Sequence, residues 1–253
     1  MDDSGDMPLL EAARLFKRFG AVMAADDLSL EVRPGEIHAM IGPNGAGKTT
    51  AIAQLSGEIK PDAGSVRFGG RDVTGLGVDA RARLGLARSF QITSLFRGFT
   101  AEDNVAMAIQ AHAGHSFRFW RDARHDPALR DPARAVLDAV GLAGRADVLA
   151  ANLAHGEQRQ LELAMALATE PKLLLLDEPM AGMGQDESVR MISLLSGLKG
   201  RLAILLVEHD MDAVFALADR ITVLVYGKAI ASGAPEAIRA DPAVREAYLG
   251  SAA

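Results

Sequence analysis

The chain has 253 residues, of which 49% are hydrophobic and 24% charged, a composition typical of a folded globular protein with a substantial apolar core. Its 33 acidic and 27 basic residues give a formal net charge of −6, which argues against a dedicated nucleic-acid-binding protein. The absence of cysteine excludes disulfides, thiolate metal sites and thiol nucleophiles. Unbroken apolar runs such as Leu202–Val207 are too short to cross a bilayer, and the acidic start Met1–Asp6 is unlike a signal peptide. We therefore expect a soluble intracellular protein.

The first third of the chain is predicted to form strands separated by glycine-containing turns. Leu28–Val32 alternates apolar and polar residues, which is the period of a half-buried strand. A short apolar run, Ile37–Ile41, leads through a glycine-rich loop into a helix expected over 48–56. Ser65–Phe68 and Arg71–Val73 flank two glycines, and this spacing predicts a β-hairpin with a two-residue turn.

Strand signals disappear between about residues 100 and 168, where Ala, Leu and Arg dominate. Thr100 and Asp103 have the spacing of a capping box, with Asp in place of the usual Glu or Gln. Asp131-Pro132 combines an N-cap residue with a proline and predicts a helix over 133–140 that ends at the following glycine. This part of the chain is therefore predicted to be mostly helical.

Strand signals return in the last third of the chain. Three apolar segments, 172–177, 202–207 and 221–226, alternate with helical stretches. Strands separated by helices predict a parallel sheet. The expected fold class is thus α/β, with one core interrupted by a mostly helical insert.

A glycine-rich loop after the apolar run 37–41 fits the phosphate-loop pattern G-x-x-x-x-G-K-[ST] at every fixed position. Its glycines let backbone N–H groups converge on a phosphate chain, and the helix that follows presents its positive end. Lys48 is predicted to reach the β- and γ-phosphates, and the Thr49 hydroxyl to ligate Mg²⁺. The loop comprises Gly42, Pro43, Asn44, Gly45, Ala46, Gly47, Lys48 and Thr49, and Thr50 follows it. The motif predicts a nucleotide-binding protein.

Two adjacent carboxylates end the apolar run Leu173–Leu176. Asp177 can hold the Mg²⁺ shell, and Glu178 can polarise an attacking water. Neighbouring residues of a strand point to opposite faces, so different roles for the two residues follow naturally. The alternative is a solvated acidic strand end, which the phosphate loop in the same chain disfavours.

Five short elements, in this order, resemble the ATP-binding subunits of ABC transporters over nearly the whole chain. They are the phosphate loop, Gln91 in Ser89-Phe90-Gln91, Leu153–Gln158 before a helix, the Asp177-Glu178-Pro179 strand end, and His209 in Val207–Asp210. The resemblance implies an ATPase that binds ATP and Mg²⁺. It also implies a P-loop NTPase core with a mostly parallel sheet, an N-terminal antiparallel β subdomain and a helical insert subdomain. The expected boundaries are a single ABC ATPase domain over 7–250, with a helical signalling subdomain over 86–168 inserted within it.

The resemblance further implies roles for single residues. Phe19 lies where the family places an aromatic residue that stacks on adenine, although a core phenylalanine is an equal alternative. Glu178 corresponds to the general base, and His209 to a switch that contacts the γ-phosphate, where an ordinary surface or packing histidine is the alternative. Gln91 corresponds to a sensor of the γ-phosphate and the metal. The residues expected at the metal are Thr49, Gln91 and Asp177.

The loop Leu153–Gln158, called the signature loop below, is expected to close on ATP held by a second subunit through Ala154 and Gly156. Two ATP molecules would then lie between two subunits arranged head to tail. The family usually has a serine hydroxyl at the position of Ala154, so this chain lacks one hydrogen bond to the γ-phosphate. The family also usually has Asp or Asn at the position of Gly184, which puts communication between the two ATP sites in doubt.

Several segments resemble one branch of the family, the importers of branched-chain and other hydrophobic amino acids. They are Leu153–Glu157, Asp177–Met183, Glu208–Phe215 and Tyr248-Leu249-Gly250. The implied partners are transmembrane permease subunits, a second ABC ATPase subunit that is identical or related, and indirectly a periplasmic or extracellular binding protein. The chain would then lie in the cytoplasm on the inner face of the membrane, with no nucleic-acid partner.

Substrate choice resides in other subunits, so the transported substrate stays open. The alternatives are import of urea or short amides and extraction of lipid or lipopolysaccharide. A soluble ABC ATPase that acts on nucleic acid or ribosomes is disfavoured, because such proteins usually carry tandem cassettes, coiled-coil insertions or basic tails. Ser116–Arg121 holds the only tryptophan between phenylalanines and arginines, and is either an anchor to the permease or membrane or part of the helical core.

The alanine in the signature loop generates a test. We predict that Ala154→Ser raises ATP-driven dimerisation or the rate of ATP turnover, because a hydrogen bond to a charged group contributes about 1.5–3 kcal/mol. Light scattering with ATP and a steady-state ATPase assay measure the two effects. Unchanged ATP affinity and rate would mean that another group already fills this role.

Overall fold

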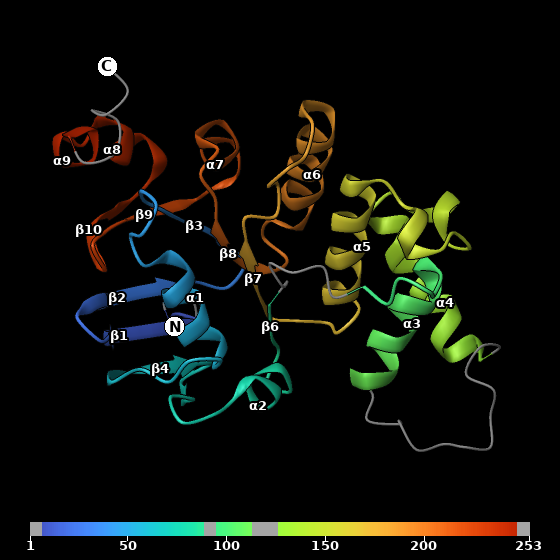
Figure 1. Cartoon of the computed structure of the whole chain (residues 1–253), viewed down its shortest axis with the longest axis horizontal. Helices are drawn as coiled ribbons and strands as arrows, with labels where there is room; N and C mark the ends of the chain where they lie inside the picture. The colour runs from blue at the N-terminus through green and yellow to red at the C-terminus, as the bar shows by residue number, and fades with distance from the viewer. Residues whose placement is uncertain (1–6, 89–94, 113–125, 247–253) are drawn as a thin grey trace, which may run out of the picture.

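The computed structural model of the chain describes residues 7–88, 95–112 and 126–246 and contains two β-sheets (Figure 1). The smaller sheet is antiparallel, in the order β2-β1-β4-β5, with β1 Leu10–Phe19, β2 Val22–Val32, β4 Ala63–Phe68 and β5 Arg71–Asp72. The larger sheet has the order β10-β9-β3-β8-β7-β6, and all its pairs are parallel except β9 with β10. Its strands are β3 Ile37–Ile41, β6 Leu86–Arg88, β7 Leu173–Asp177, β8 Ala203–Val207, β9 Arg220–Val225 and β10 Lys228–Gly233.

Helices cover the larger sheet and extend beyond its β6 edge. Helix α1 (Lys48–Ser56) lies between the two sheets, and α5 (His155–Leu167) and α6 (Gln185–Leu198) stand on the opposite side of β7 (Figure 1). The segment between β6 and β7 contains α3 (Ala101–His112), α4 (Pro127–Ala139), α5 and two short 3₁₀ turns, Ala143–Arg145 and Ala150–Asn152. The remaining helices are α2 Val78–Ala82, α7 Met211–Leu217, α8 Pro235–Ala240 and α9 Pro242–Val244. No helix in the described ranges combines the length and apolar character that a membrane span needs.

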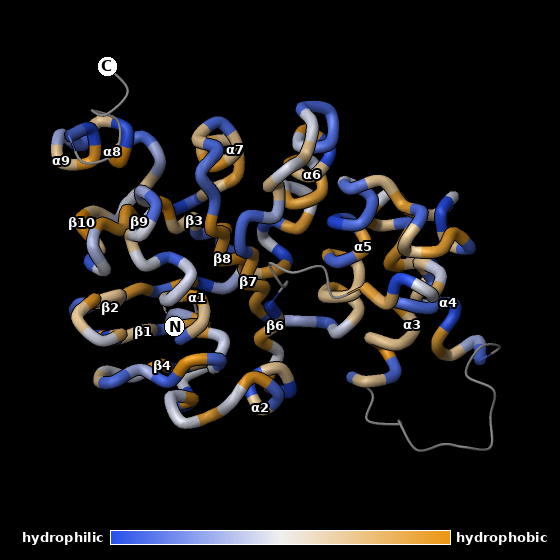
Figure 2. Tube along the Cα trace, viewed as in Figure 1, coloured by the Kyte–Doolittle hydropathy of each residue, from blue (hydrophilic) through white to orange (hydrophobic). Residues whose placement is uncertain are grey.

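The central strands are apolar on both faces because each face packs on a different core. Every residue of β3, β7 and β8 is buried, as expected for parallel strands covered on both sides. Leu173 and Leu175 of β7 belong to the core that includes α1 and the antiparallel sheet, whereas Leu174 and Leu176 belong to the core of α5 and α6. Figure 2 shows this hydrophobic centre along β7 and β8. Strand β7 is thus shared by two cores.

The structure confirms the predicted α/β fold class and several local predictions. The strand 37–41 and the helix 48–56 have the predicted bounds. The hairpin β4–β5 turns through two glycines with positive φ, at 55° and 75°. The Thr100–Asp103 capping box is complete, because each side chain accepts the other residue's backbone N–H, at 3.1 and 3.2 Å. The division into a domain over 7–250 with an insert over 86–168 stays a prediction.

The predicted start of the second helix in this region is wrong. Helix α4 begins at Pro127, because Asp126 forms the N-cap and its carboxylate accepts the N–H of Ala128 at 3.1 Å. Pro132 therefore lies inside the helix, where it removes one backbone hydrogen bond. The sequence 126–132 contains two Asp-Pro pairs, and only the first makes the cap. The segment Ser116–Arg121 and the ending Tyr248-Leu249-Gly250 lie outside the described residues.

The helix that follows the phosphate loop is held at its far end by a buried arginine. The side chain of Arg81, on α2, is 1% exposed. Its guanidinium donates to the backbone carbonyls of Gln54 and Leu55 at the end of α1, at 2.8 and 2.6 Å, and to those of Leu76 and Thr74. A positive charge at a helix C-terminus satisfies its free carbonyls and favours the helix dipole.

A buried histidine connects the two sheets. The Nδ1 atom of His38, on β3, lies 2.7 Å from the Glu31 carbonyl of β2, so Nδ1 carries the proton and donates. Its Nε2 lies 2.8 Å from the Thr222 hydroxyl of β9, which also contacts the Ser232 hydroxyl of β10. Burial lowers the pKa of His38 to about 4, although the charge of Glu36 opposes this shift. The folded protein therefore holds His38 neutral.

We predict that this histidine makes the protein less stable in mild acid. The unfolded chain binds a proton below about pH 6.5, whereas the folded chain binds it only near pH 4. Stability is therefore lost as the pH falls between these values, by a total on the order of 3 kcal/mol. Urea unfolding of the wild type and His38→Gln from pH 7.5 to 4.5 measures this, with the exposed residue in His112→Gln as control. Equal pH slopes for wild type and His38→Gln would contradict the prediction.

Candidate nucleotide-binding site

The phosphate loop joins β3 to α1 in a conformation that only glycine allows at two positions. Gly42 and Gly47 have φ values of 155° and 101°. A Cβ on Gly42 would overlap the carbonyl oxygen of Leu224, and one on Gly47 would overlap that of Ala24. Gly47 also precedes the first residue of α1, so the free N–H groups of the helix start open onto the loop.

The turn between β9 and β10 supports the loop from behind. The N–H of Gly227 donates to the carbonyl of Ala46 at 2.8 Å, and its carbonyl accepts the N–H of Asp26 at 2.9 Å. These bonds connect the loop to β2 of the antiparallel sheet. The loop is therefore fixed by both sheets.

The ammonium group of Lys48 lies over the loop. Its Nζ donates to the carbonyls of Gly42 and Pro43, at 2.6 and 3.1 Å. Burial lowers the pKa of Lys48, and the nearby charges of Glu178 and Asp177 oppose that shift. The two carboxylates favour the charged form of Lys48, which is the form that would bind phosphate oxygens. Thr49 is exposed and Thr50 half-buried at the start of α1.

Asp177, at the end of β7, is a buried carboxylate with one unused oxygen. The residue is 4% exposed, and its Oδ2 accepts from the Arg88 guanidinium at 3.2 Å. Its Oδ1 is buried without a hydrogen-bond partner. Burial raises the pKa of Asp177, although the charges of Arg88 and Lys48 lower it. An unpaired buried oxygen of this kind suits a cation.

These residues fit a Mg²⁺ ion that arrives with a nucleotide. No group of three or more His, Asp or Glu side chains suited to a metal occurs in the part of the chain that the structure describes. Mg²⁺ bound with a nucleotide needs only one or two carboxylates, because phosphates and water complete its octahedron. Thr49 and Asp177 supply oxygens of the required type. Gln91, the third predicted metal residue, lies outside the described residues.

Glu178 and His209 lie side by side in the structure. Glu178 has a positive φ of 50°, and its N–H donates to the carbonyl of Val207 at 2.9 Å. This left-handed conformation is costly for a residue with a side chain and occurs often at functional sites. The Glu178 carboxylate is one-third exposed, and its Oε1 lies 4.0 Å from Nδ1 of His209.

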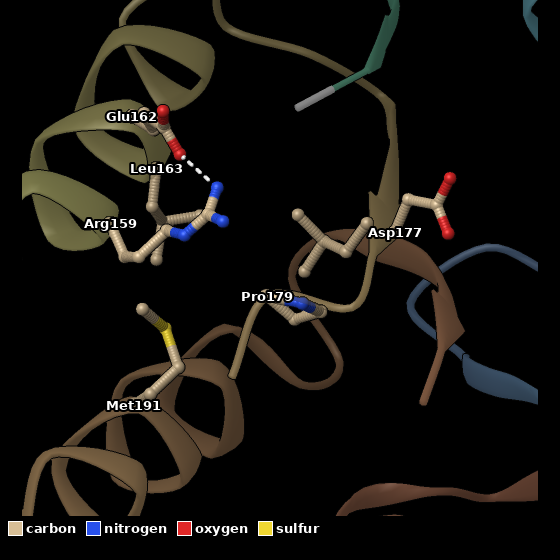
Figure 3. Close-up of a pocket in the computed structure, with 7 residues that line it drawn as sticks. Arg159, Glu162, Leu163, Asp177, Pro179 and Met191 are labelled. Atoms are coloured by element: carbon tan, nitrogen blue, oxygen red, sulfur yellow. Dashed lines mark hydrogen bonds and ion pairs between the residues drawn. The ribbon is translucent and has the colours of Figure 1, made fainter. Parts of the chain in front are cut away.

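Figure 3 shows the carboxylate of Asp177 turned away from the helical side of β7. On that side, a small cavity lies between α5, the end of β7 and α6, and is lined by Arg159, Glu162, Leu163, Leu176, Asp177, Pro179 and Met191. Arg159 and Glu162 form an ion pair of 2.9 Å along α5. The Asp177 carboxylate therefore belongs to the phosphate-loop side.

The structure adds Glu208, a buried carboxylate before His209 that sequence reasoning did not single out. Glu208 is 1% exposed, and its oxygens accept the N–H groups of Met180 at 3.0 Å and His209 at 3.1 Å. Burial raises the pKa of Glu208, and these N–H donors oppose the rise. Glu208 thus ties the loop after Pro179 to the loop that carries His209. A carboxylate at the end of a wholly apolar strand is the sequence signal that could have identified it.

Ala154 and Gly156 contact residues of α5 and α6, and no contact between them and the phosphate loop is found among the described residues. Ala154 is the N-cap of α5, and its N–H donates to Glu157 at 2.9 Å, which is one half of a capping box. A Cβ on Gly156 would overlap the carboxylate of Glu187 on α6. Glu187 in turn accepts the N–H of Gly184 at 3.0 Å. Other residues of the signature loop contact Ala181, through His155, and Arg145, through Glu157. These described contacts lie within the helical side of the chain and do not include the phosphate loop.

Phe19 is not a core residue, so the core interpretation is wrong. It ends β1 with 48% of its surface exposed, and Lys17 Nζ lies 5.6 Å from its ring centroid. Its predicted role in stacking on adenine stays a prediction.

Two family models match the chain. The model described as "ABC transporter" matches residues 25–181, and the model described as "Branched-chain amino acid ATP-binding cassette transporter" matches residues 230–253. The branched-chain amino acid transport ATP-binding protein LivG of Salmonella typhimurium is 40% identical over 97% of this chain and 99% of its own length. BraF of Pseudomonas aeruginosa, with the same description, is 38% identical over 97% of this chain and 99% of its own.

The chain is also similar to a lipopolysaccharide export protein and to two solved structures. LptB, a lipopolysaccharide export ATP-binding protein of Acidithiobacillus ferridurans, is 34% identical over 96% of this chain and 97% of its own. A nucleotide-free ATP-binding cassette of an ABC transporter superposes with a TM-score of 0.84 at 27% identity, over 96% of this chain and 99% of that one. The ADP conformation of the cassette MJ1267 gives 0.85 at 28% identity, with the same coverage.

We predict that Glu208→Gln slows ATP hydrolysis without unfolding the protein. The amide keeps one acceptor for Met180 but turns a donor toward the N–H of His209, which displaces the histidine. Removal of a buried charge offsets the lost hydrogen bond, so stability changes little. Small displacements at reacting groups are expensive, and we expect kcat to fall about tenfold or more.

Steady-state kinetics and thermal unfolding measure the two effects. Glu31→Gln, on an exposed position of β2, is the matched control and is expected to behave as wild type. A wild-type kcat in Glu208→Gln would show that this carboxylate does not position His209.

Proposed function

The chain belongs to the ABC transporter family of ATP-binding proteins, and from this premise we propose that it hydrolyses ATP to drive import of branched-chain or related amino acids. The site supports this activity through one observation above all. Four side chains from three separate parts of the chain face one another at the ends of β3, β7 and β8. They are Lys48, Asp177, Glu178 and His209. Parallel strands place their carboxyl ends at one edge, where α/β proteins bind ligands.

Each residue in this group has a distinct task in the proposed hydrolysis. Lys48 and the N–H groups of the phosphate loop would hold the β- and γ-phosphates. Mg²⁺, held through Thr49 and Asp177, would supply positive charge that neutralises the phosphates during transfer. Glu178 would accept a proton from the attacking water, and His209 would orient the γ-phosphate.

The proposed reaction requires a second subunit. The contacts of Ala154 and Gly156 within this chain are with Glu157 and Glu187, so the signature loop remains available to ATP on another chain. We infer a head-to-tail dimer, with an identical or a related ATPase, in which each signature loop completes the other site. Phe19, exposed at the end of β1, would stack on adenine.

Amino-acid import is favoured over the other transport reactions by the C-terminal part of the chain. The branched-chain amino acid transporter model matches residues 230–253, which include most of β10 and all of α8 and α9. The LivG and BraF proteins, named for branched-chain amino acid transport, are also more similar to the chain than the LptB protein is, at 38–40% against 34% identity. Permease subunits would anchor the chain at the inner face of the cell membrane, and a separate binding protein would select the substrate.

The general-base assignment gives the sharpest test of the ATPase. We predict that Glu178→Gln binds ATP as the wild type does but hydrolyses it at least about a hundredfold more slowly, since the amide cannot accept the proton from water. Filter binding with labelled ATP and phosphate release measure the two quantities, and Glu31→Gln is the control. Full hydrolysis by Glu178→Gln would overturn the assignment of the base.

Transport itself is tested in proteoliposomes that contain the chain with its co-purified membrane subunits and the soluble binding protein. We expect ATP-dependent uptake of labelled leucine, isoleucine or valine, and none with Glu178→Gln. Uptake of urea or short amides alone, or release of lipopolysaccharide without amino-acid uptake, would contradict the import of amino acids and leave the ATPase assignment intact.

A further inference from the structure

Arg88 is a buried cation that the proposed hydrolysis does not use. It is the last residue of β6, and its side chain is 8% exposed. Its Nη2 lies 3.2 Å from Oδ2 of Asp177, and its Nη1 lies 2.5 Å from Oε2 of Glu58. One guanidinium therefore bridges two carboxylates, one wholly buried and the other one-third exposed.

One carboxylate ends the strand β7, and the other lies just beyond the C-terminus of the helix α1, whose first turn holds the proposed metal residue Thr49. They are those of Asp177 and of Glu58, which follows Gly57 at the C-cap of α1. The contact of Nη2 with Asp177 is a hydrogen bond, whereas the contact of Nη1 with Glu58 is an ion pair without hydrogen-bond geometry. One planar guanidinium can make both contacts at once. The bridge of Arg88 therefore joins the helix of Thr49 to the strand of Asp177.

The bridge of Arg88 uses only one of the two carboxylate oxygens of Asp177. Arg88 contacts Oδ2, while Oδ1 is buried without a hydrogen-bond partner. A carboxylate held through one oxygen has a fixed orientation, and its second oxygen can bind a metal without rearrangement.

We propose that Arg88 is a positioning residue for Mg²⁺: it fixes Asp177 through one oxygen, presents the other to the metal, and is itself held by Glu58. This inference rests on the proposed ATPase function, because the metal arrives with ATP. It assigns Arg88 no contact with the nucleotide. Its effect is therefore confined to the part of ATP binding that depends on Mg²⁺.

The test compares ATP binding with and without the metal. The affinity for a fluorescent, non-hydrolysable ATP analogue is measured in EDTA and in saturating Mg²⁺, for wild type and Arg88→Met. In EDTA, we expect affinities within twofold of each other, because the phosphate loop is unchanged. The gain in affinity on adding Mg²⁺ is expected to be about tenfold smaller in Arg88→Met, the usual scale for loss of a group that orients a metal ligand.

Mn²⁺ provides a readout that does not depend on affinity. The electron paramagnetic resonance spectrum of Mn²⁺ with the analogue is expected to broaden in Arg88→Met, because the Asp177 oxygen no longer has one orientation. Arg67→Met, on an exposed position of β4, is the matched control and is expected to match wild type in both measurements. Arg88→Lys, which can reach only one carboxylate, is expected to fall between wild type and Arg88→Met.

A second variant, Glu58→Gln, keeps the inference testable if Arg88→Met does not fold. Glu58 is partly exposed, and Arg88 remains paired with Asp177 when Glu58 is replaced. The replacement therefore leaves no buried charge without a partner. We expect about a twofold loss of the Mg²⁺-dependent gain. We also expect no further loss when Glu58→Gln is added to Arg88→Lys or Arg88→Met, because Glu58 acts through Arg88.

Three outcomes separate this inference from the function on which it rests. Equal loss of affinity in EDTA and in Mg²⁺ would show that Arg88 only supports the fold, and would overturn the inference. An unchanged Mg²⁺-dependent gain in Arg88→Met, or in Glu58→Gln should Arg88→Met not fold, would also overturn it while leaving the ATPase intact. Absence of analogue binding by the wild type would overturn both.

Discussion

The site depends on keeping the Asp177 carboxylate charged where water is excluded. Burial favours the neutral acid, and it therefore raises the pKa of Asp177. Two cations oppose it: Lys48 from the phosphate loop and Arg88 from β6. A buried charge without such partners is strongly destabilising, so the positions of these two side chains are constrained as tightly as that of the carboxylate. In the proposed reaction, a divalent cation bound with ATP would meet a carboxylate that is already desolvated and oriented.

The position of Asp177 depends on the rest of the molecule because its strand, β7, belongs to two hydrophobic cores. Its odd-numbered leucines pack with α1 and its even-numbered ones pack with α5 and α6. Protein interiors are close-packed, so the end of β7 cannot shift without moving side chains in both cores. The helix behind the phosphate loop and the helix behind the signature loop are thus positioned by opposite faces of one five-residue strand.

The parts of the fold that could be predicted from sequence are those set by local chemistry. The strand 37–41, the helix 48–56 and the Thr100–Asp103 capping box depend on residues within a few positions of one another. The start of α4 could not be predicted in the same way. Asp126-Pro127 and Asp131-Pro132 carry the same local signal, and only the folded chain shows that the first pair makes the cap.

The site shows the same division. Lys48, Asp177, Glu178 and His209 belong to motifs, and the structure places Lys48 near the two carboxylates and Glu178 beside His209. Arg88 and Glu208 act through contacts 89 and 28 residues away along the chain, to Asp177 and Met180. Their roles follow from which strand ends meet, and no local pattern reports that. Gln91 illustrates the reverse case, since it is identified by its motif alone.

Gly184 has no side chain to contact a second subunit, and on this ground the sequence puts communication between the two ATP sites in doubt. The backbone offers another route. Gly156 of the signature loop packs against Glu187, which also accepts the N–H of Gly184, and His155 Nε2 lies 3.3 Å from the carbonyl of Ala181.

The loop that begins at Met180 continues this route toward the chain's own site, because Glu208 joins Met180 to His209. In the proposed dimer, a displacement of the signature loop by one ATP would therefore reach the γ-phosphate switch of the other through direct contacts. Each step is a hydrogen bond or a close packing contact between neighbours, so the signature loop and the loop of His209 are physically connected within the chain. The missing side chain at Gly184 then removes one contact across the dimer while the path within the chain remains.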